Sequence, residues 1–371
     1  MQLINATKLQ AGDTLAVQPD GREVLVVVVK GTFTIPETPD QDPALAKDQV
    51  LLVMTDVFTG EPGFSAPLYE MDFAMRKPRC DVLLNGSAYA PSGNPTDRVA
   101  VSLRVGSLTK SFDVVGKRVW KSGVLDPTPT PPEPFEKMPI SYNNAFGGVD
   151  KAQEDPAKWR WYLLNHAGVG YHEYTSGRFI DGKPLPNTEE RGSEISNPKG
   201  SYRPMALGPV GRAWQPRVKL AGTYDQKWID TTFPFLPDDF QDAYHQAAPV
   251  DQQTDYLQGG EEVELTNLTP HGRIAFTLPE MPVPFELFYR NGERKYVSGV
   301  IDTLLLEPDA RRFTMCSRMS MPLRRNLDEI RSVIAGPMPT GWYTGEGLQR
   351  SPTGKPRFKS LAHLGRQAAE E

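Results

Sequence analysis

The stretch VAVSLRVGSLTKSFDVV, residues 99–115, decides the fold class of this chain. Apolar residues occupy every second position on both sides of Gly106-Ser107, with polar or small residues between them. A two-residue turn at Gly106-Ser107 gives three facing pairs: Val105 with Leu108, Val101 with Phe112, and Val99 with Val114. These pairs place the apolar side chains of both strands on one face, with Lys110 as the exception. The stretch therefore predicts a β-hairpin.

Further runs of strand length lie on both sides of this hairpin. The expected strands are Glu23–Val29, Val50–Val57, Glu261–Leu268, Arg273–Leu278, Val283–Arg290, Lys295–Leu306 and Arg312–Ser317. Asn291-Gly292 predicts a second hairpin turn, and Pro308-Asp309 another turn. The 32 glycines and 35 prolines are spread along the chain, which suits many strands joined by turns and argues against a helical bundle.

Only a few short helices are expected. One lies near Asp155–Asn165, where Asp155 is the N-cap and a proline follows at the first helical position. A last helix is predicted at Leu327–Ile334, because Asn326 can cap it and its apolar residues share one face. The fold class that results is mostly β: two β-sandwich or barrel-like units with a loop-rich middle and a few short helices.

The proline-rich segment DPTPTPPEP, residues 126–134, is the best linker candidate, because proline fixes its own dihedral angle and donates no backbone hydrogen bond. We accordingly predict four parts. They are an N-terminal β unit at 1–126, a linker at 127–137, a loop-rich and β unit at 138–345, and a polar tail at 346–371. Whether the two β regions are independent domains stays open at this level.

Composition excludes several functional classes. A net charge of -5 gives no reason to expect a nucleic-acid partner, which normally meets a concentrated basic surface. The two cysteines, Cys80 and Cys316, lack any metal-ligand spacing. No apolar run is long enough to span a bilayer, and the first residues lack the pattern of a signal peptide. We therefore expect a cytoplasmic protein with no membrane association.

Signatures of catalysis are missing from the sequence. The five histidines form no HExxH pair, and no GxSxG, GxxxxGK[ST] or strand-linked GxGxxG motif occurs. We predict no catalytic, cofactor-binding or metal-binding residues. Paired carboxylates leave no sequence signature, so a hydrolase that uses carboxylates of the central loops remains an alternative.

Three long segments carry a resemblance: SYNNAFGGVD at 141–150, GPVGRAWQPRVKLAGTYDQKWIDTTFPFLPDDFQDAYHQAAPVDQQ at 208–253, and LQGGEEVELTNLTPHG at 257–272. Together they resemble the domain-of-unknown-function family of type VI secretion adaptor-chaperones, encoded beside PAAR and effector genes. The resemblance is strong over about 139–284 and weak in the N-terminal region. It implies a non-catalytic protein that binds and stabilises an effector, or its PAAR-bearing part, and helps load it onto the VgrG spike.

The candidate residues for structure or partner binding come from these motifs and from a methionine-rich strand. They are Tyr142, Asn143, Asn144, Phe146, Gly147, Gly148, Trp214, Tyr224, Asp225, Trp228, Met315, Met319 and Met321. Tyr142, Phe146 and Trp214 are expected to be buried and to hold the central loops. The methionines lie between the basic pairs at 311–312 and 324–325, and this stretch is expected to be a solvated strand end and helix start, or else an adaptable contact surface.

Two classes of function compete with the adaptor, and each requires a different surface. An adaptor requires an exposed apolar patch, and an enzyme requires a polar pocket with a perturbed carboxylate or histidine. A carbohydrate-binding or structural β module requires an aromatic platform, for which Trp214, Trp228 and Trp342 are candidates. The oligomeric state, the effector and the contact surface are not predicted.

Overall fold

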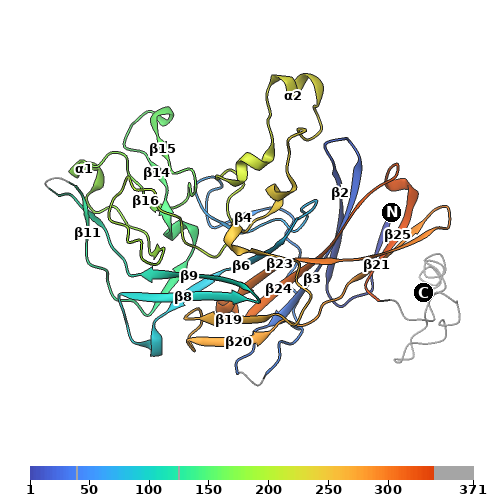
Figure 1. Cartoon of the computed structure of the whole chain (residues 1–371), viewed down its shortest axis with the longest axis horizontal. Helices are drawn as coiled ribbons and strands as arrows, with labels where there is room; N and C mark the ends of the chain where they lie inside the picture. The colour runs from blue at the N-terminus through green and yellow to red at the C-terminus, as the bar shows by residue number, and fades with distance from the viewer. Residues whose placement is uncertain (39–40, 124–125, 338–371) are drawn as a thin grey trace, which may run out of the picture.

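The largest sheet has six strands and combines segments from both ends of the chain (Figure 1). A computed structural model describes residues 1–38, 41–123 and 126–337. The strands, in spatial order, are β18 (Gln253–Thr254), β6 (Cys80–Leu84), β23 (Val300–Glu307), β24 (Arg312–Pro322), β3 (Glu23–Thr34) and β2 (Gln10–Val17). The mostly β prediction is confirmed, and the described sheets are open rather than closed into a barrel.

Burial on both faces explains the apolar run in β3. The six residues of 24–29 are each at most 1% exposed, so a continuous apolar run is needed where simple alternation would leave one polar face. β24 pairs antiparallel with β3 from Arg312 opposite Thr34 to Pro322 opposite Val24. The predicted strands at both positions are confirmed and are longer than expected.

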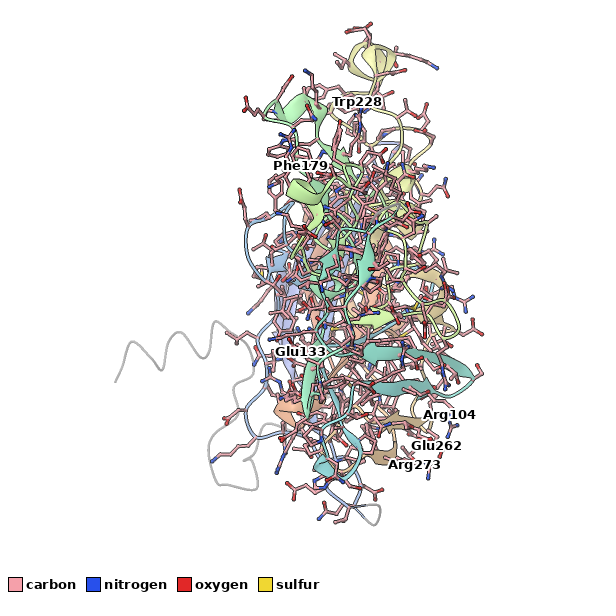
Figure 2. The ribbon with its side chains drawn as sticks, turned by 90° about the vertical axis from the view of Figure 1, so that its left-hand side faces the viewer. Arg104, Glu133, Phe179, Trp228, Glu262 and Arg273 are labelled. Atoms are coloured by element: carbon pink, nitrogen blue, oxygen red, sulfur yellow. The ribbon has the colours of Figure 1, made fainter. Side chains whose placement is uncertain are left out.

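The five-stranded sheet contains the predicted hairpin. Its order is β17 (Thr188–Glu189), β9 (Leu108–Val115), β8 (Arg98–Val105), β19 (Glu262–Thr266) and β20 (Arg273–Thr277). The register pairs Val105 with Leu108 and Val99 with Val114, as the sequence predicts. Gly106 has φ 54°, a backbone conformation that glycine adopts without a steric cost. Arg104 on β8 and Arg273 on β20 both form ion pairs with Glu264 on β19, so these pairs cross three neighbouring strands of this sheet (Figure 2).

A four-stranded sheet contains the second predicted hairpin. Its order is β1 (Gln2–Asn5), β25 (Ile330–Ala335), β21 (Pro284–Tyr289) and β22 (Arg294–Ser298). The turn around Asn291-Gly292 is confirmed, with the Gly292 amide donating to the Tyr289 carbonyl at 3.1 Å.

The helix predicted at Leu327–Ile334 is wrong. Only a short 3-10 turn, η8 (Leu327–Glu329), forms there, and β25 follows directly. β25 pairs on one side with β1 and on the other with β21. Its β-branched residues suit a strand, and backbone pairing on both sides outweighs the local helical pattern.

Three other element predictions need correction. Residues 50–56 form no strand, because side chains of the core bind their backbone: the Val53 amide donates to Asp72 at 2.7 Å. The predicted Lys295–Leu306 strand divides into β22 and β23 at Gly299, where a Cβ would lie 2.2 Å from the Ser317 hydroxyl. The helix near Asp155 shrinks to η3 (Pro156–Lys158), although Asp155 caps it as predicted.

Five two-stranded sheets complete the described β-structure. They are β4 (Val57–Phe58) with β5 (Pro67–Tyr69), β7 (Gly86–Tyr89) with β12 (Lys137–Ile140), β10 (Trp120–Lys121) with β11 (Thr128–Pro129), β13 (Phe146–Gly147) with β16 (Val169–Gly170), and β14 (Val149–Asp150) with β15 (Arg160–Trp161). The proline-rich segment pairs with β10 through β11, and its Thr130 and Glu133 amides donate to the Val119 and Lys117 carbonyls. Strands from both sides of this segment share the six-stranded and five-stranded sheets, while the predicted domain limits stay a prediction.

The segment between β17 and β18 is loop-rich, as predicted, and it positions the candidate site. It contains the helix α2 (Gln226–Thr231) and the 3-10 turns η4 (Arg217–Ala221), η5 (Asp242–His245) and η6 (Val250–Gln252). In Figure 1, α2 projects beyond the rest of the ribbon at the top of the molecule.

Candidate functional site

An exposed apolar projection, here named the aromatic arm (residues 222–240), extends from the loop-rich segment around α2 (Figures 1 and 2). Its large apolar side chains face solvent. The exposed fractions are 53% for Tyr224, 54% for Ile229, 65% for Phe233 and 42% for Phe235. Single exposed apolar residues are ordinary on protein surfaces, but a group on one short projection is characteristic of an interaction site.

The base of the aromatic arm is closed by local contacts. The carboxylate of Asp239 accepts hydrogen bonds from the Thr223 amide at 2.9 Å and from the Thr223 hydroxyl at 2.8 Å. Gly222 has φ 87°, and a Cβ there would lie 2.9 Å from Asp239 and from Pro237. The close approach of the two ends therefore requires glycine at this position.

Hydrogen bonds also order the tip of the arm. Asp225 caps α2, because its side chain accepts from the Trp228 amide at 2.9 Å. The Trp228 indole donates to the Phe235 carbonyl at 2.9 Å. Its ring contacts Tyr224 and Phe233 edge to face, with centroids 4.8 and 5.5 Å apart. The exposed aromatic rings are thus held in place before any partner arrives, which reduces the entropy lost on binding.

Carboxylates lie around a hollow beside the Trp228 side chain of the arm. Asp225, Asp238 and Asp239 border this hollow of about 270 Å³, where the only lining cation among the described residues is Lys227. The two hydrogen bonds from Thr223 hold the pKa of Asp239 below its usual value. The hollow beside Trp228 is therefore acidic.

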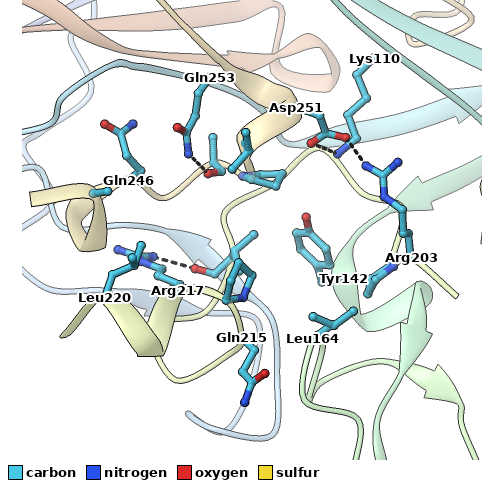
Figure 3. Close-up of a pocket in the computed structure, with 17 residues that line it drawn as sticks. Lys110, Tyr142, Leu164, Arg203, Gln215, Arg217, Leu220, Gln246, Asp251 and Gln253 are labelled. Atoms are coloured by element: carbon cyan, nitrogen blue, oxygen red, sulfur yellow. Dashed lines mark hydrogen bonds and ion pairs between the residues drawn. The ribbon is translucent and has the colours of Figure 1, made fainter. Parts of the chain in front are cut away.

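A larger pocket, here named the basal pocket, lies where the chain enters and leaves the aromatic arm (Figure 3). Its volume is about 490 Å³, within the range of small-molecule sites. η4 and the segment from η5 to η6 supply about half of the lining residues, and the others come from β9, β18, Tyr142, Leu164 and the loop at 203–216. Apolar side chains make up most of the lining, and glutamines add a few amide groups, so the pocket is chiefly apolar.

One end of the basal pocket is charged. The Lys110 ammonium donates to Gln252 at 2.7 Å and lies 3.2 Å from the Asp251 carboxylate. Arg203 binds the other oxygen of Asp251 at 2.8 Å. Burial lowers the pKa of Lys110 to about 8, because the charged form loses hydration there. The Tyr142 hydroxyl points toward this group in Figure 3.

Three aromatic residues of the central loops, Tyr142, Phe146 and Trp214, are buried between these loops and the rest of the protein. The predicted burial of Tyr142, Phe146 and Trp214 is confirmed, with exposed fractions of 4%, 0% and 3%. The rings of Tyr142 and Trp214 meet edge to face at 5.4 Å. Phe146 contacts Tyr162 and Tyr202, each with centroids 4.9 Å away. These aromatic residues hold the long loops against the rest of the protein.

The remaining motif residues bind backbone or approach it closely. The side chain of Asn143 accepts from the Ala66 amide at 2.7 Å, and that of Asn144 donates to the Pro139 carbonyl at 3.1 Å. A Cβ at Gly147 would lie 2.3 Å from a backbone oxygen, and one at Gly148 2.4 Å from another. The structure gives all four residues a role in shaping the loop.

The methionines of β24 lie in the protein interior, so the expectation of a solvated strand end or a contact surface at these positions is wrong. Met315, Met319 and Met321 are exposed by 0%, 1% and 5%, and all three belong to the main hydrophobic core. Of the candidate residues from sequence, the structure brings only Tyr224, Asp225 and Trp228 together on an exposed surface. Sequence reasoning missed Ile229, Phe233 and Phe235, although the apolar letters of the IDTTFPF run were visible at 229–235.

Several buried ionisable groups are engaged in ion pairs. Lys30 binds Asp72 at 2.7 Å, Lys77 binds Asp81 at 2.8 Å, and Arg318 binds Asp302. Burial and nearby guanidinium groups lower the pKa of His245 to about 3. Within the described ranges, no group of three His, Cys, Asp or Glu side chains could hold a metal ion.

The predicted aromatic platform is divided. Trp214 is buried beside Tyr142, whereas Trp228 lies half-buried in the aromatic arm. Trp342 lies outside the described residues. Trp214 and Trp228 therefore do not form one flat sugar-binding surface.

The fold and site define a mostly β protein with a projecting aromatic arm and a chiefly apolar pocket at its base. A family model described as "Uncharacterized protein conserved in bacteria (DUF2169)" matches residues 20–318, and the chain belongs to this bacterial family. No curated protein and no solved structure showed a significant similarity to the chain. Among the described residues, no helix has the length and apolarity needed to cross a membrane.

Proposed function

We propose that the protein is a non-catalytic adaptor-chaperone whose aromatic arm binds a partner polypeptide. The observation that carries this proposal is the exposure of Tyr224, Ile229, Phe233 and Phe235 on one ordered projection. A partner that covers these rings removes apolar surface from water, and rigid aromatic anchors contribute disproportionately to such interfaces. Binding only the folded partner stabilises it by about 2.7 kcal/mol at a hundredfold excess over Kd.

The partner we propose is a type VI secretion effector, or its PAAR-bearing part, which the adaptor helps to load onto VgrG. The support is the resemblance of the segments at 141–150, 208–253 and 257–272. The aromatic arm lies inside the longest of these segments. We place this activity in the cytoplasm of the producing cell, before the effector is secreted.

Binding without turnover is supported by the state of the ionisable groups in the pockets. Lys110, Arg203 and Asp251 form one network in the basal pocket, and Arg217 there binds Glu70. A hydrolase with paired carboxylates needs two carboxyl groups facing a common space, one of them with a raised pKa. Among the described residues, the lining of the basal pocket includes one carboxylate, Asp251. The hollow of the aromatic arm has three, but there the hydrogen bonds from Thr223 lower the pKa of Asp239 rather than raise it.

Co-expression with the effector encoded beside this gene tests the proposal. The arm variant combines Ile229→Ser with Phe233→Ser. The matched control combines Leu51→Ser with Tyr296→Ser, two residues that are 72% and 67% exposed and lie outside the arm. We expect the wild type and the control to raise the effector level and to co-purify with it, and the arm variant to do neither. Equal effector levels with and without the wild-type chain, and no co-purification, would defeat the proposal.

A further inference from the structure

The basal pocket has features of a built ligand site that the adaptor role does not require. It is about 490 Å³ in volume, and its apolar walls include Val210, Leu220 and Ala248. Exposed apolar residues mark the rim, where Leu164 is 37% and Val250 is 79% exposed. A small apolar ligand would therefore meet matching surface both inside the pocket and at its mouth.

The charged end of the pocket contains a polar group with no partner. Tyr142 is 4% exposed, and its hydroxyl points toward Asp251 and Arg203 (Figure 3). Among the described residues nothing forms a hydrogen bond with this hydroxyl, and its oxygen is not one of the fully buried atoms without a partner, so it is open to the pocket. A hydroxyl that faces a cavity with its donor and acceptor capacity unused offers a place where a ligand atom can bind.

Lys110 is the least compensated charge near this hydroxyl. Among the described residues it forms one ion pair, with Asp251, and Asp251 is shared with Arg203, which also binds Glu190 at 2.8 Å. The Lys110 side chain is 5% exposed, so its ammonium has little hydration to offset its burial. A ligand anion beside Lys110 would supply a second counter-charge and would accept a hydrogen bond from Tyr142.

We propose that the basal pocket binds an apolar ligand that ends in a carboxylate. The apolar part lies against the walls from η4 and η5, and the carboxylate accepts hydrogen bonds from Tyr142, Lys110 and Arg203. A fatty acyl chain and the apolar C-terminus of a polypeptide share this chemistry. The site is separate from the exposed rings of the aromatic arm, so it stands or falls independently of the adaptor function.

Calorimetric titration of the purified full-length chain tests the site. The probes are octanoate, octanamide and octylamine, which share the apolar chain and differ in the charge of the head. We expect octanoate to bind at least tenfold more tightly than octanamide, because a hydrogen bond to a charged group contributes more than one to a neutral group. Equal affinity for the amide, a preference for the amine, or no saturable binding of octanoate would overturn the proposal.

Two variants locate the binding. Tyr142→Phe removes only the hydroxyl, and Arg203→Gln changes a side chain that is 57% exposed, so folding should survive the second change in any case. We expect each to weaken octanoate binding about tenfold. The control is Tyr89→Phe, which removes a hydroxyl bonded to Asp309 outside the pocket and should leave the affinity unchanged. Unchanged affinity in both pocket variants would place octanoate elsewhere and contradict the assignment.

A further titration distinguishes the two sources of the ligand. Acetyl-Leu-Leu with a free C-terminal carboxylate represents a polypeptide end, and octanoate represents an acyl chain. Tighter binding of acetyl-Leu-Leu than of octanoate identifies a polypeptide end as the source, and the reverse identifies an acyl chain. A variant that loses octanoate binding but still co-purifies with the effector would show that the pocket is separate from the adaptor function. A variant that loses the effector but still binds octanoate would show the same.

Discussion

Asp239 and Thr223 lock the two ends of the aromatic arm together, through hydrogen bonds of 2.9 and 2.8 Å to one carboxylate. The segment between them makes no strand, so these contacts and the cap of α2 set its shape. The positions of the exposed rings therefore depend mainly on a few local interactions, together with the contact of the Phe235 ring with Gly21 in the turn between β2 and β3. That dependence allows the arm to be changed without disturbing the core.

Asp239→Ala should weaken effector binding while leaving global stability nearly unchanged. The change removes both hydrogen bonds that close the arm, so the rings lose their fixed positions and binding costs more conformational entropy. Because Asp239 is exposed and contacts only the arm through these bonds, the urea midpoint of the whole protein should change little. Effector affinity and the urea midpoint are the two measurements. The neighbouring exposed Asp238→Ala is the control, and an equal loss of affinity there would contradict the role of the lock.

Phe146→Ala should destabilise the protein strongly. Phe146 is completely buried and contacts Tyr162 and Tyr202 edge to face. Truncation of a buried phenylalanine costs about 3–5 kcal/mol. The free energy of unfolding from urea denaturation measures this loss. Phe233→Ala, at a residue 65% exposed, should cost far less, and similar midpoints for the two variants would show that the motif does not hold the loops.

Lys110→Met should flatten the alkaline part of the stability profile. Burial lowers the pKa of Lys110 to about 8 from 10.5, so the unfolded chain keeps its proton between these values while the folded chain loses it. The Lys110 contribution therefore raises stability as pH increases from 8 to 10.5, by up to about 3 kcal/mol. The nearby Asp251, Arg203 and Glu190 affect this titration and remain in both proteins.

Urea denaturation of the wild type and the Lys110→Met variant at several pH values above 7 gives the free energy of unfolding of each. The difference between the two measures the contribution of Lys110, because all other titrating groups are shared. The stability of the Met variant relative to the wild type should fall as pH rises through this range. A difference that stays constant from pH 7 to 10.5 would show that Lys110 keeps an ordinary pKa.

His245→Phe should reduce the acid sensitivity of the fold. Burial, followed by the charges of Arg212 and Arg217, lowers the pKa of His245 to about 3, so the folded state keeps the ring neutral. The unfolded chain takes up a proton below about pH 6.5, so stability is lost as pH falls from 6.5 toward 3. Between pH 6.5 and 5 the loss is at most about 2 kcal/mol. Parallel stability profiles for wild type and variant over that range would contradict the assignment.

Local patterns were readable from the sequence where the fold depends on neighbours in the chain. The hairpin around Gly106-Ser107 needs only alternation and a turn, and its register is as predicted. β25 was not readable, because the pairing that makes it a strand comes from β1 and β21. The strand predicted over residues 50–56 is absent for a similar reason, because Asp72 binds the backbone of this segment from outside it.

The candidate site was only partly predictable. Tyr224, Asp225 and Trp228 were found through their motif, and Lys110 was noted as the exception on an apolar face. The basal pocket was not predictable, because Lys110, Tyr142 and Asp251 come from three distant segments that only the fold brings together. No periodicity in a sequence indicates such a convergence.

Amide hydrogen exchange of the chain, alone and in complex with its co-expressed effector, tests the central claim most directly. Docking on the aromatic arm should slow exchange in residues 223–240, because a partner that covers the exposed rings also restricts opening of α2. The Leu51→Ser and Tyr296→Ser control should show the same protection, and the Ile229→Ser and Phe233→Ser variant should show none. A stable complex in which residues 223–240 exchange as fast as in the free chain would contradict the account.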